Sequence, residues 1–123
     1  MKIGIVGYRY FNNYPIFEKY IIQYLSEELN VNINDTELTI ISGGASGADT
    51  LAKKFSSNHN INFEEYPAEW NKYGSPNAAY IRNQLIVDNS EIIIAFLHPQ
   101  SRGTYDTINR AKKGDIPIKI FKI

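Results

Sequence analysis

Short apolar runs alternate along this chain with segments whose apolar residues recur every three or four positions. Five runs predict buried β-strands, over residues 2–6, 38–42, 61–66, 91–97 and 116–123. Helical spacing between them predicts helices after Pro15, after Ala48, over 78–89 and over 104–113. This alternation is typical of a mainly parallel sheet with helices on both faces.

The pattern therefore predicts one α/β domain over residues 1–123 with a five-stranded sheet, and 123 residues suit a single domain. Folds of this class bind ligands beyond the carboxyl ends of the strands, near the point where the strand order reverses. Four loops leave those ends, at residues 7–14, 43–48, 67–77 and 98–103. We expect the functional site among these loops.

A glycine-rich loop follows the second strand, with Gly43, Gly44, Ser46, Gly47 and Asp49. Glycine lets a ligand approach the main-chain N–H groups, and a helix start adds unpaired donors and partial positive charge. A bound phosphate is one interpretation. The other is a capping box, in which Ser46 and Asp49 close the helix without any ligand. The local sequence leaves both interpretations open.

A second loop of similar character follows the fourth strand and contains Ser101, Arg102, Gly103 and Thr104. Its hydroxyl groups could cap the next helix or bind a phosphate. Arg102 could pair with an anion or simply be solvated. Two helix starts of this kind near each other favour a phosphate-bearing ligand more strongly than either loop does alone.

Arg82 lies within the stripe of the 78–89 helix that we expect to face the sheet, predicted as Ala78, Ile81, Leu85 and Asn89. An inward arginine must be paired or must hold an anion. We expect an anion, and the alternative is an ion pair with Asp88, Glu69 or Asp49. Asn83 could contact a ribose or a base edge, or could only solvate the helix.

The remaining candidates lie in the first and third loops. Gly7 begins the first loop, which brings Arg9 to the expected crevice, where it suits a phosphate or is merely exposed. Trp70 is the only tryptophan and could stack on a base or pack over the sheet edge. The same choice applies to Tyr8, Tyr10 and Tyr73.

Several classes of function are excluded or disfavoured. The chain has no cysteine, and its histidines and carboxylates show no metal-ligand spacing, so we expect no metal and no cofactor. The glycine loops match neither a Walker loop nor a dinucleotide fingerprint.

No signal peptide or membrane-spanning run is visible, which favours the cytoplasm, or the host cytoplasm for a viral protein. The net charge of zero argues against nucleic acid as a partner. A homo-oligomer is left open.

Four motifs occur in the order of a known family: VGYRYF, GGASGADTLA, PAEW…YG…AAYIRN and SRGTYDTINRAKKGDIPI. The chain resembles the small SLOG-type Rossmann-like proteins of the YspA/YpsA-related group, found in bacteria and phages. Distant relatives include the Lonely Guy phosphoribohydrolases and the DNA-processing protein DprA. The resemblance implies a Rossmann-like fold and a nucleotide pocket, without fixing one activity.

The same resemblance implies roles for particular residues. The glycine loop with Asp49 would form one wall of the pocket. Arg82 would match the arginine that the phosphoribohydrolases use at the ribose-phosphate, and Ser101, Gly103 and Thr104 would match their second phosphate loop. The catalytic glutamate of those hydrolases is replaced by Thr107. Asp106 is one residue away, about 100° round the helix, so hydrolysis by that mechanism is in doubt.

These observations lead to one main hypothesis and two alternatives. The main hypothesis is a protein that binds a nucleotide or an ADP-ribose-like molecule, to sense or sequester it. The first alternative is a nucleotide N-glycosidic hydrolase in which Asp106 or Glu69 replaces the usual glutamate. The second is DprA-like binding of single-stranded DNA, against which the net charge argues.

Overall fold

The computed structural model describes all 123 residues and contains a five-stranded sheet in the order β3-β2-β1-β4-β5. Every neighbouring pair of strands is parallel. The strands are β1 (Lys2–Gly7), β2 (Thr39–Ser42), β3 (Asn62–Glu65), β4 (Ile92–Leu97) and β5 (Ile118–Lys122). The predicted α/β fold is confirmed, and the sheet is parallel throughout.

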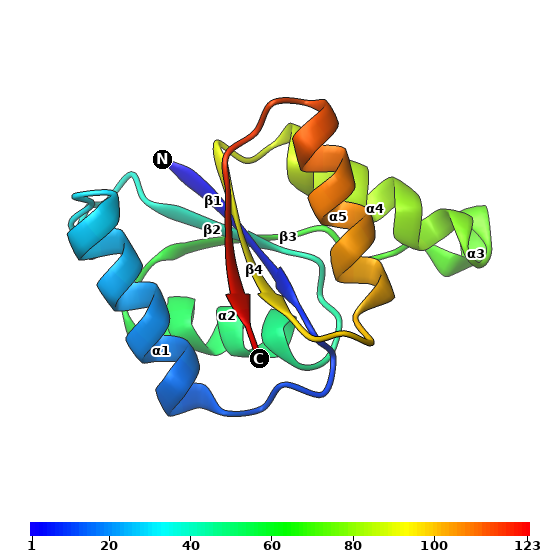
Figure 1. Cartoon of the computed structure of the whole chain (residues 1–123). Coiled ribbons are helices and arrows are strands. Elements are labelled where there is room, and N and C mark those ends of the chain that lie inside the picture. Colours follow the sequence, from blue (N-terminus) through cyan, green and yellow to red (C-terminus); the bar gives the residue numbers. More distant parts are fainter.

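Helices cover both faces of this sheet (Figure 1). They are α1 (Tyr14–Gln23), which continues into a π-helical turn η1 (Tyr24–Glu28), α2 (Ala48–Asn58), α3 (Trp70–Tyr73), α4 (Asn77–Asp88) and α5 (Arg102–Lys113). The predicted elements agree with these bounds to within a few residues, except for α3. That helix lies inside the segment 67–77, which we predicted as a loop. The sequence did not reveal it because a single turn is too short to show helical periodicity.

The two faces of the sheet have separate hydrophobic cores. Ile3 and Ile5 of β1 pack with Phe17 of α1 and Phe55 of α2 on one face. Val6 and alternate residues of the other central strands pack against α4 and α5 on the opposite face. All six residues of β4 are buried. Burial on both faces explains why the strands read as unbroken apolar runs.

The predicted inward stripe of α4 is wrong at two positions. Ile81 and Leu85 are 37% and 41% exposed, whereas the buried residues of α4 are Ala78, Asn83, Ile86 and Val87. The helix carries apolar residues on two sides, so periodicity alone could not choose between them. Neighbouring residues lie about 100° apart round the axis. Arg82 therefore lies at the border of the buried face rather than at its centre.

The strand order reverses between β1 and β4, and this reversal positions the site. The chain runs from β1 to β2 and β3 on one side, then crosses to β4 on the other side of β1. The loops after β1 and β4 both leave the carboxyl ends of the strands, where α2 and α5 also begin. The carboxyl ends are the usual ligand site of an open parallel sheet. No helix combines the length and apolar character needed to cross a membrane.

Candidate functional site

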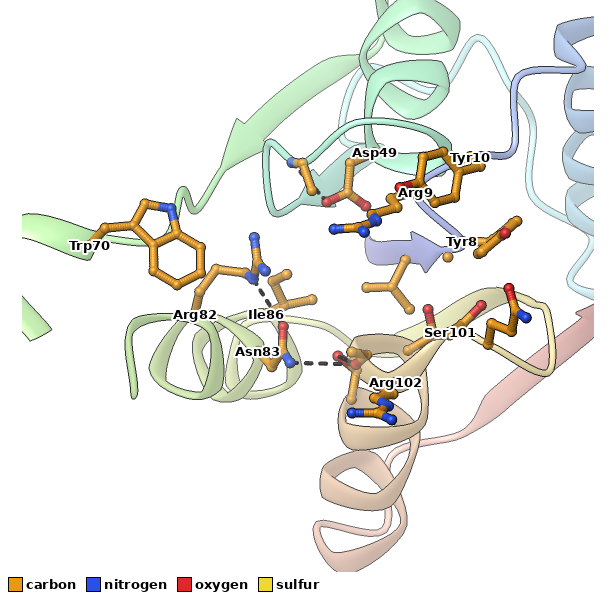
Figure 2. Close-up of a pocket in the computed structure, with 17 residues that line it drawn as sticks. Tyr8, Arg9, Tyr10, Asp49, Trp70, Arg82, Asn83, Ile86, Ser101 and Arg102 are labelled. Carbon is orange, nitrogen blue, oxygen red and sulfur yellow. Dashed lines mark hydrogen bonds between the residues drawn. The ribbon is translucent and has the colours of Figure 1, made fainter. Parts of the chain in front are cut away.

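A cavity of about 550 Å³ opens at the carboxyl ends of β1 and β4 (Figure 2). Ten of the expected ligand-binding residues line it: Gly7, Arg9, Asp49, Trp70, Arg82, Asn83, Ser101, Arg102, Gly103 and Thr104. The other four, Gly43, Gly44, Ser46 and Gly47, lie outside the lining, as do Glu69 and Asp106. Most of the expected residues are thus gathered around one cavity, and the glycine-rich loop touches it mainly through Asp49.

Some lining residues were not proposed from the sequence. Val6, Ala45, Ile86 and Gln100 also face the cavity. Val6 and Ile86 are apolar residues of regular elements, and nothing in their sequence context separates them from the core. Thr107 lines the cavity as well. Its position in the helix is the one that the resemblance assigns to the glutamate of the phosphoribohydrolases.

Gly47 is required by contacts within the chain. Its φ is 75°, and a Cβ there would lie 2.3 Å from the carbonyl oxygen of Tyr8. The same carbonyl accepts a hydrogen bond of 3.2 Å from the N–H of Ala48. The loop after β1 therefore crosses the start of α2 so closely that only glycine fits. This crossing accounts for Gly47 without a ligand.

The capping box, one of the two interpretations that the sequence left open, does not form. The N-cap of α2 is Gly47, which has no side chain to cap the helix, and the Ser46 side chain makes no hydrogen bond. Asp49 does reach back, because its Oδ2 accepts a 3.1 Å hydrogen bond from the N–H of Ala45. The acidic side chain is thereby fixed at the cavity wall, in the first turn of α2.

Asp49 is a buried carboxyl group, only 7% exposed. Burial raises its pKa from 3.8 to about 6. The Ala45 N–H bond and the Arg82 charge lower that pKa and so offset part of the effect of burial. Ser42 Oγ also lowers it, although that buried oxygen forms no hydrogen bond of standard geometry. At neutral pH the carboxyl group is mostly ionised and would repel an anion placed next to it.

We expect Asp49→Asn to stabilise the protein at high pH. Because the folded-state pKa is raised, the contribution of Asp49 to stability is fully present below about pH 4 and is lost as pH rises through about 6. One pKa unit is worth about 1.4 kcal/mol, so asparagine should gain at most about 3 kcal/mol at pH 8. Urea unfolding of both proteins at pH 5 and pH 8 measures this gain.

An exposed carboxyl group supplies the control for that measurement. Asp88 lies at the end of α4 and is exposed, so Asp88→Asn should change the unfolding free energy by a similar small amount at both pH values. A stability difference between wild type and Asp49→Asn that is the same at pH 5 and pH 8 would contradict the raised pKa.

The start of α5 offers free hydrogen-bond donors to the cavity. The N–H groups of Gly103 and Thr104 make no hydrogen bond within the chain. Thr104 is 5% exposed and lines the cavity. Ser101 Oγ accepts a 3.0 Å bond from the N–H of His98, so its own hydrogen is free to donate. A helix start with such donors suits an anion.

The start of α2 is less suited to an anion. Its first N–H, at Ala48, already donates to the carbonyl of Tyr8. The carboxyl group of Asp49 also occupies this end of the cavity. The two glycine loops that look alike in the sequence therefore present different chemistry, and α5 has the better donors for a phosphate.

Arg82 extends from α4 across the cavity towards Asp49 (Figure 2). Its Nη1 donates to the carbonyl of Gly43 at 2.9 Å, and its Nε donates to Asn83 Oδ1 at 2.9 Å. None of the three carboxylates considered from the sequence forms a salt bridge with it within 4.0 Å. The remaining donors of the guanidinium group are free.

Aromatic side chains surround the mouth of the cavity. Trp70 lines the cavity and is 52% exposed, so about half of its surface is open to solvent. Tyr10 is 65% exposed, and the guanidinium group of Arg9 lies 4.9 Å from its ring centre. The Tyr8 ring stacks on His98 at 4.1 Å. Trp70 and Tyr10 are thus the rings available to a planar ligand.

Different kinds of side chain occupy different parts of the cavity. In Figure 2, Trp70 lies at one end of the drawn residues and Ser101 with Arg102 at the other, with Arg82 and Asp49 between them. No group of three or more His, Asp or Glu side chains gathers as it would around a metal ion. A ring, a polar middle and an anion site in this order match the parts of a nucleotide.

Comparisons with known proteins agree with the fold. The model of the YspA, cpYpsA-related SLOG family matches residues 1–73. A search of curated proteins found no match. DNA processing protein A (DprA) from Streptococcus pneumoniae superposes with a TM-score of 0.74 and 19% identity, covering 97% of this chain and 49% of that one. DprA from Helicobacter pylori gives 0.64 and 20%, covering 98% and 64%. The chain thus spans half to two thirds of these proteins.

One of these structures corrects the expectation about nucleic acid. The Helicobacter pylori protein is described by its mode of binding single-stranded DNA, so a protein with this fold can take nucleic acid as a partner. The argument from a net charge of zero was wrong because it averages over the whole surface. Three arginines, Arg9, Arg82 and Arg102, line a single cavity.

Proposed function

Because the chain belongs to the YspA, cpYpsA-related SLOG family, we propose that it binds a nucleotide or an ADP-ribose-like molecule in the cavity at the carboxyl ends of β1 and β4. Family and fold both support a role in binding nucleotides or nucleic acid. The finer proposal is a small ligand that lies along the cavity with its phosphate at α5. Such binding would sense or sequester the ligand.

The observation that carries this proposal is the pair of unbonded N–H groups at Gly103 and Thr104. Both residues line the cavity, as does Arg102. A phosphate there would accept main-chain hydrogen bonds and gain from the positive end of α5. It would also lie away from the Asp49 carboxylate, which an anion must avoid.

The middle and the far end of the cavity fit the rest of a nucleotide. The carboxyl group of Asp49 can accept hydrogen bonds from ribose hydroxyl groups, and the free donors of Arg82 can bind a ribose oxygen or a second phosphate. The exposed ring of Trp70 can stack on a base. This assignment gives Asp49, Arg82 and the start of α5 partners of suitable chemistry.

Binding without hydrolysis is favoured by the position of the carboxylates. Thr107 lines the cavity, and its hydroxyl group donates to the carbonyl of Gly103 at 3.2 Å. Asp106 lies outside the lining and is held by Arg110 at 2.8 Å. Glycoside hydrolysis needs carboxylates on both sides of the scissile bond. Asp49 is the only carboxyl group in the cavity lining.

Titration calorimetry with AMP, ADP and ADP-ribose tests the proposal, with Gly103→Asp as the blocking variant. A Cβ at Gly103 would meet nothing within 4 Å, so the variant should fold. An aspartate in the first turn of α5 should even stabilise the helix by up to about 1 kcal/mol. Its carboxylate would occupy the phosphate position, and we expect affinity to fall at least about tenfold.

The control is Gly103→Ala, which adds no charge and should bind more tightly than Gly103→Asp. Equal, wild-type affinity for a nucleotide in the folded Gly103→Asp protein would refute a phosphate at α5. Chromatography of the same samples after overnight incubation measures release of free base. We expect none, and substantial release by wild type that Asp106→Asn abolishes would instead establish a hydrolase.

Single-stranded DNA is the second candidate ligand. The exposed rings of Tyr10 and Trp70 stand near Arg9, Arg82 and Arg102, and stacking rings with basic residues are the usual means of holding a single strand. Fluorescence anisotropy with a labelled oligo-dT distinguishes the two. Tight, strongly salt-dependent binding that AMP does not displace would favour DNA.

A further inference from the structure

Arg82 is oriented by an uncommon contact with its neighbour in the sequence. Adjacent residues on a helix do not normally face each other, yet the Nε of Arg82 donates to Asn83 Oδ1 at 2.9 Å. Asn83 is buried, with only 5% of its surface exposed. Its amide group therefore acts as a fixed support on one side of the guanidinium group, and the carbonyl of Gly43 supports the other side.

The amide of Asn83 could in principle be turned either way, and Asp106 is the nearer of the two acceptors that decide which. Asn83 Nδ2 donates to Asp106 Oδ2 at 2.9 Å and, over a longer distance of 3.4 Å, to the carbonyl oxygen of Gly103. A carboxylate can only accept, so the NH₂ end of the amide must face it. A turned amide would set its oxygen against the carboxylate and its NH₂ against the Arg82 N–H. Both of those contacts are repulsive.

Asp106 is itself held from outside the cavity. Arg110 lies one turn further along α5 and donates from Nε to the same Oδ2 at 2.8 Å. Its Nη1 donates to Gln84 Oε1 at 3.0 Å, which ties α5 to α4. Asp106 faces a separate groove beside α4 and α5. A continuous set of hydrogen bonds thus runs from Arg110 through Asp106 and Asn83 to Arg82.

We propose that Asp106 is a positioning residue, which fixes the Asn83 amide so that Arg82 is held in its ligand-binding orientation. This inference rests on the proposed function, since it assumes that the free donors of Arg82 contact the ligand. It assigns Asp106 a role through Arg82 rather than contact with the ligand. It also explains why a carboxylate is placed behind the cavity wall.

AMP binding by five variants, one of them double, tests this role. Asp106→Ala should lower the affinity for AMP about tenfold, while Asp106→Asn, which keeps an acceptor for Asn83, should stay within about threefold of wild type. Asp106→Ala should cause no further loss in an Arg82→Ala background. Asp88→Ala is the matched control, because Asp88 lines the same groove but bonds only to Gln84, and its affinity should be unchanged.

A ligand-free measurement separates this inference from the proposed function. The Arg82 Nε–H resonance in NMR spectra should be protected from exchange in wild type and Asp106→Asn, and should lose that protection in Asp106→Ala. Unchanged protection, or equal losses of affinity with and without Arg82, would overturn the positioning role. If wild type binds none of AMP, ADP and ADP-ribose, the proposed function fails, and the resonance still decides whether Asp106 orients Arg82.

Discussion

Replacement of Gly47 by alanine is expected to lower the unfolding free energy by at least about 3 kcal/mol. Two costs combine. The backbone at Gly47 has φ 75° and ψ −127°, a region close to the one that only glycine occupies readily, and strain there costs about 1–3 kcal/mol. The new Cβ would also lie 2.3 Å from the carbonyl oxygen of Tyr8 and from the main chain of Arg9. Urea or thermal unfolding measures the loss.

Gly74→Ala separates the two costs. Gly74 has a similar backbone, with φ 72° and ψ 176°, but a Cβ there would meet nothing within 4 Å. This variant should show the strain alone, about 1–3 kcal/mol. If the two variants lose equal stability, the crossing of the first loop over α2 does not explain Gly47. A larger loss at Gly47 assigns this glycine to packing within the chain.

Replacement of Arg82 by alanine is expected to weaken nucleotide binding about 10- to 150-fold. A hydrogen bond between charged groups contributes about 1.5–3 kcal/mol, and each 1.4 kcal/mol changes affinity tenfold. The variant should also be less stable by about 1–3 kcal/mol, because Asn83 Oδ1 is left without its donor. Titration calorimetry with AMP and urea unfolding of the same samples measure both effects.

Arg82→Lys is the informative companion to that variant. Lysine keeps the positive charge but lacks the fork that joins Gly43 and Asn83. We expect its affinity to lie between those of wild type and Arg82→Ala. Reduced stability with wild-type affinity in Arg82→Ala would show that Arg82 only holds the wall of the cavity together and does not contact the ligand.

The sequence predicted the architecture well because its main signals are local. The unbroken apolar run of β4 follows directly from burial on both faces. The position of the cavity, at the carboxyl ends of the strands, could be predicted from topology, since parallel strands bring their loops together at those ends. The resemblance placed Thr107 at the cavity, and helix geometry then put Asp106 about 100° round the axis from it. Thr107 lines the cavity, and its neighbour does not.

The features that sequence reasoning missed depend on contacts between distant segments. Ile81 and Ile86 are both apolar, and only the packing of α4 beside α5 decides that Ile86 is buried. Gly47 resembles a phosphate-loop glycine until the first loop is seen to cross it. The distinction between the starts of α2 and α5 likewise depends on which N–H groups other segments already occupy.

The central place of β1 has a consequence for how the protein is made. β1 pairs with β4 through residues as far apart in the sequence as Ile3 and Ile92, so one side of β1 stays unpaired until β4 has been synthesised. Unpaired apolar edges promote aggregation, and pairings between distant strands form slowly. The cavity also exists only once β4 and α5 are in place. A ligand would therefore bind and stabilise only molecules in which β4 and α5 have folded, by mass action.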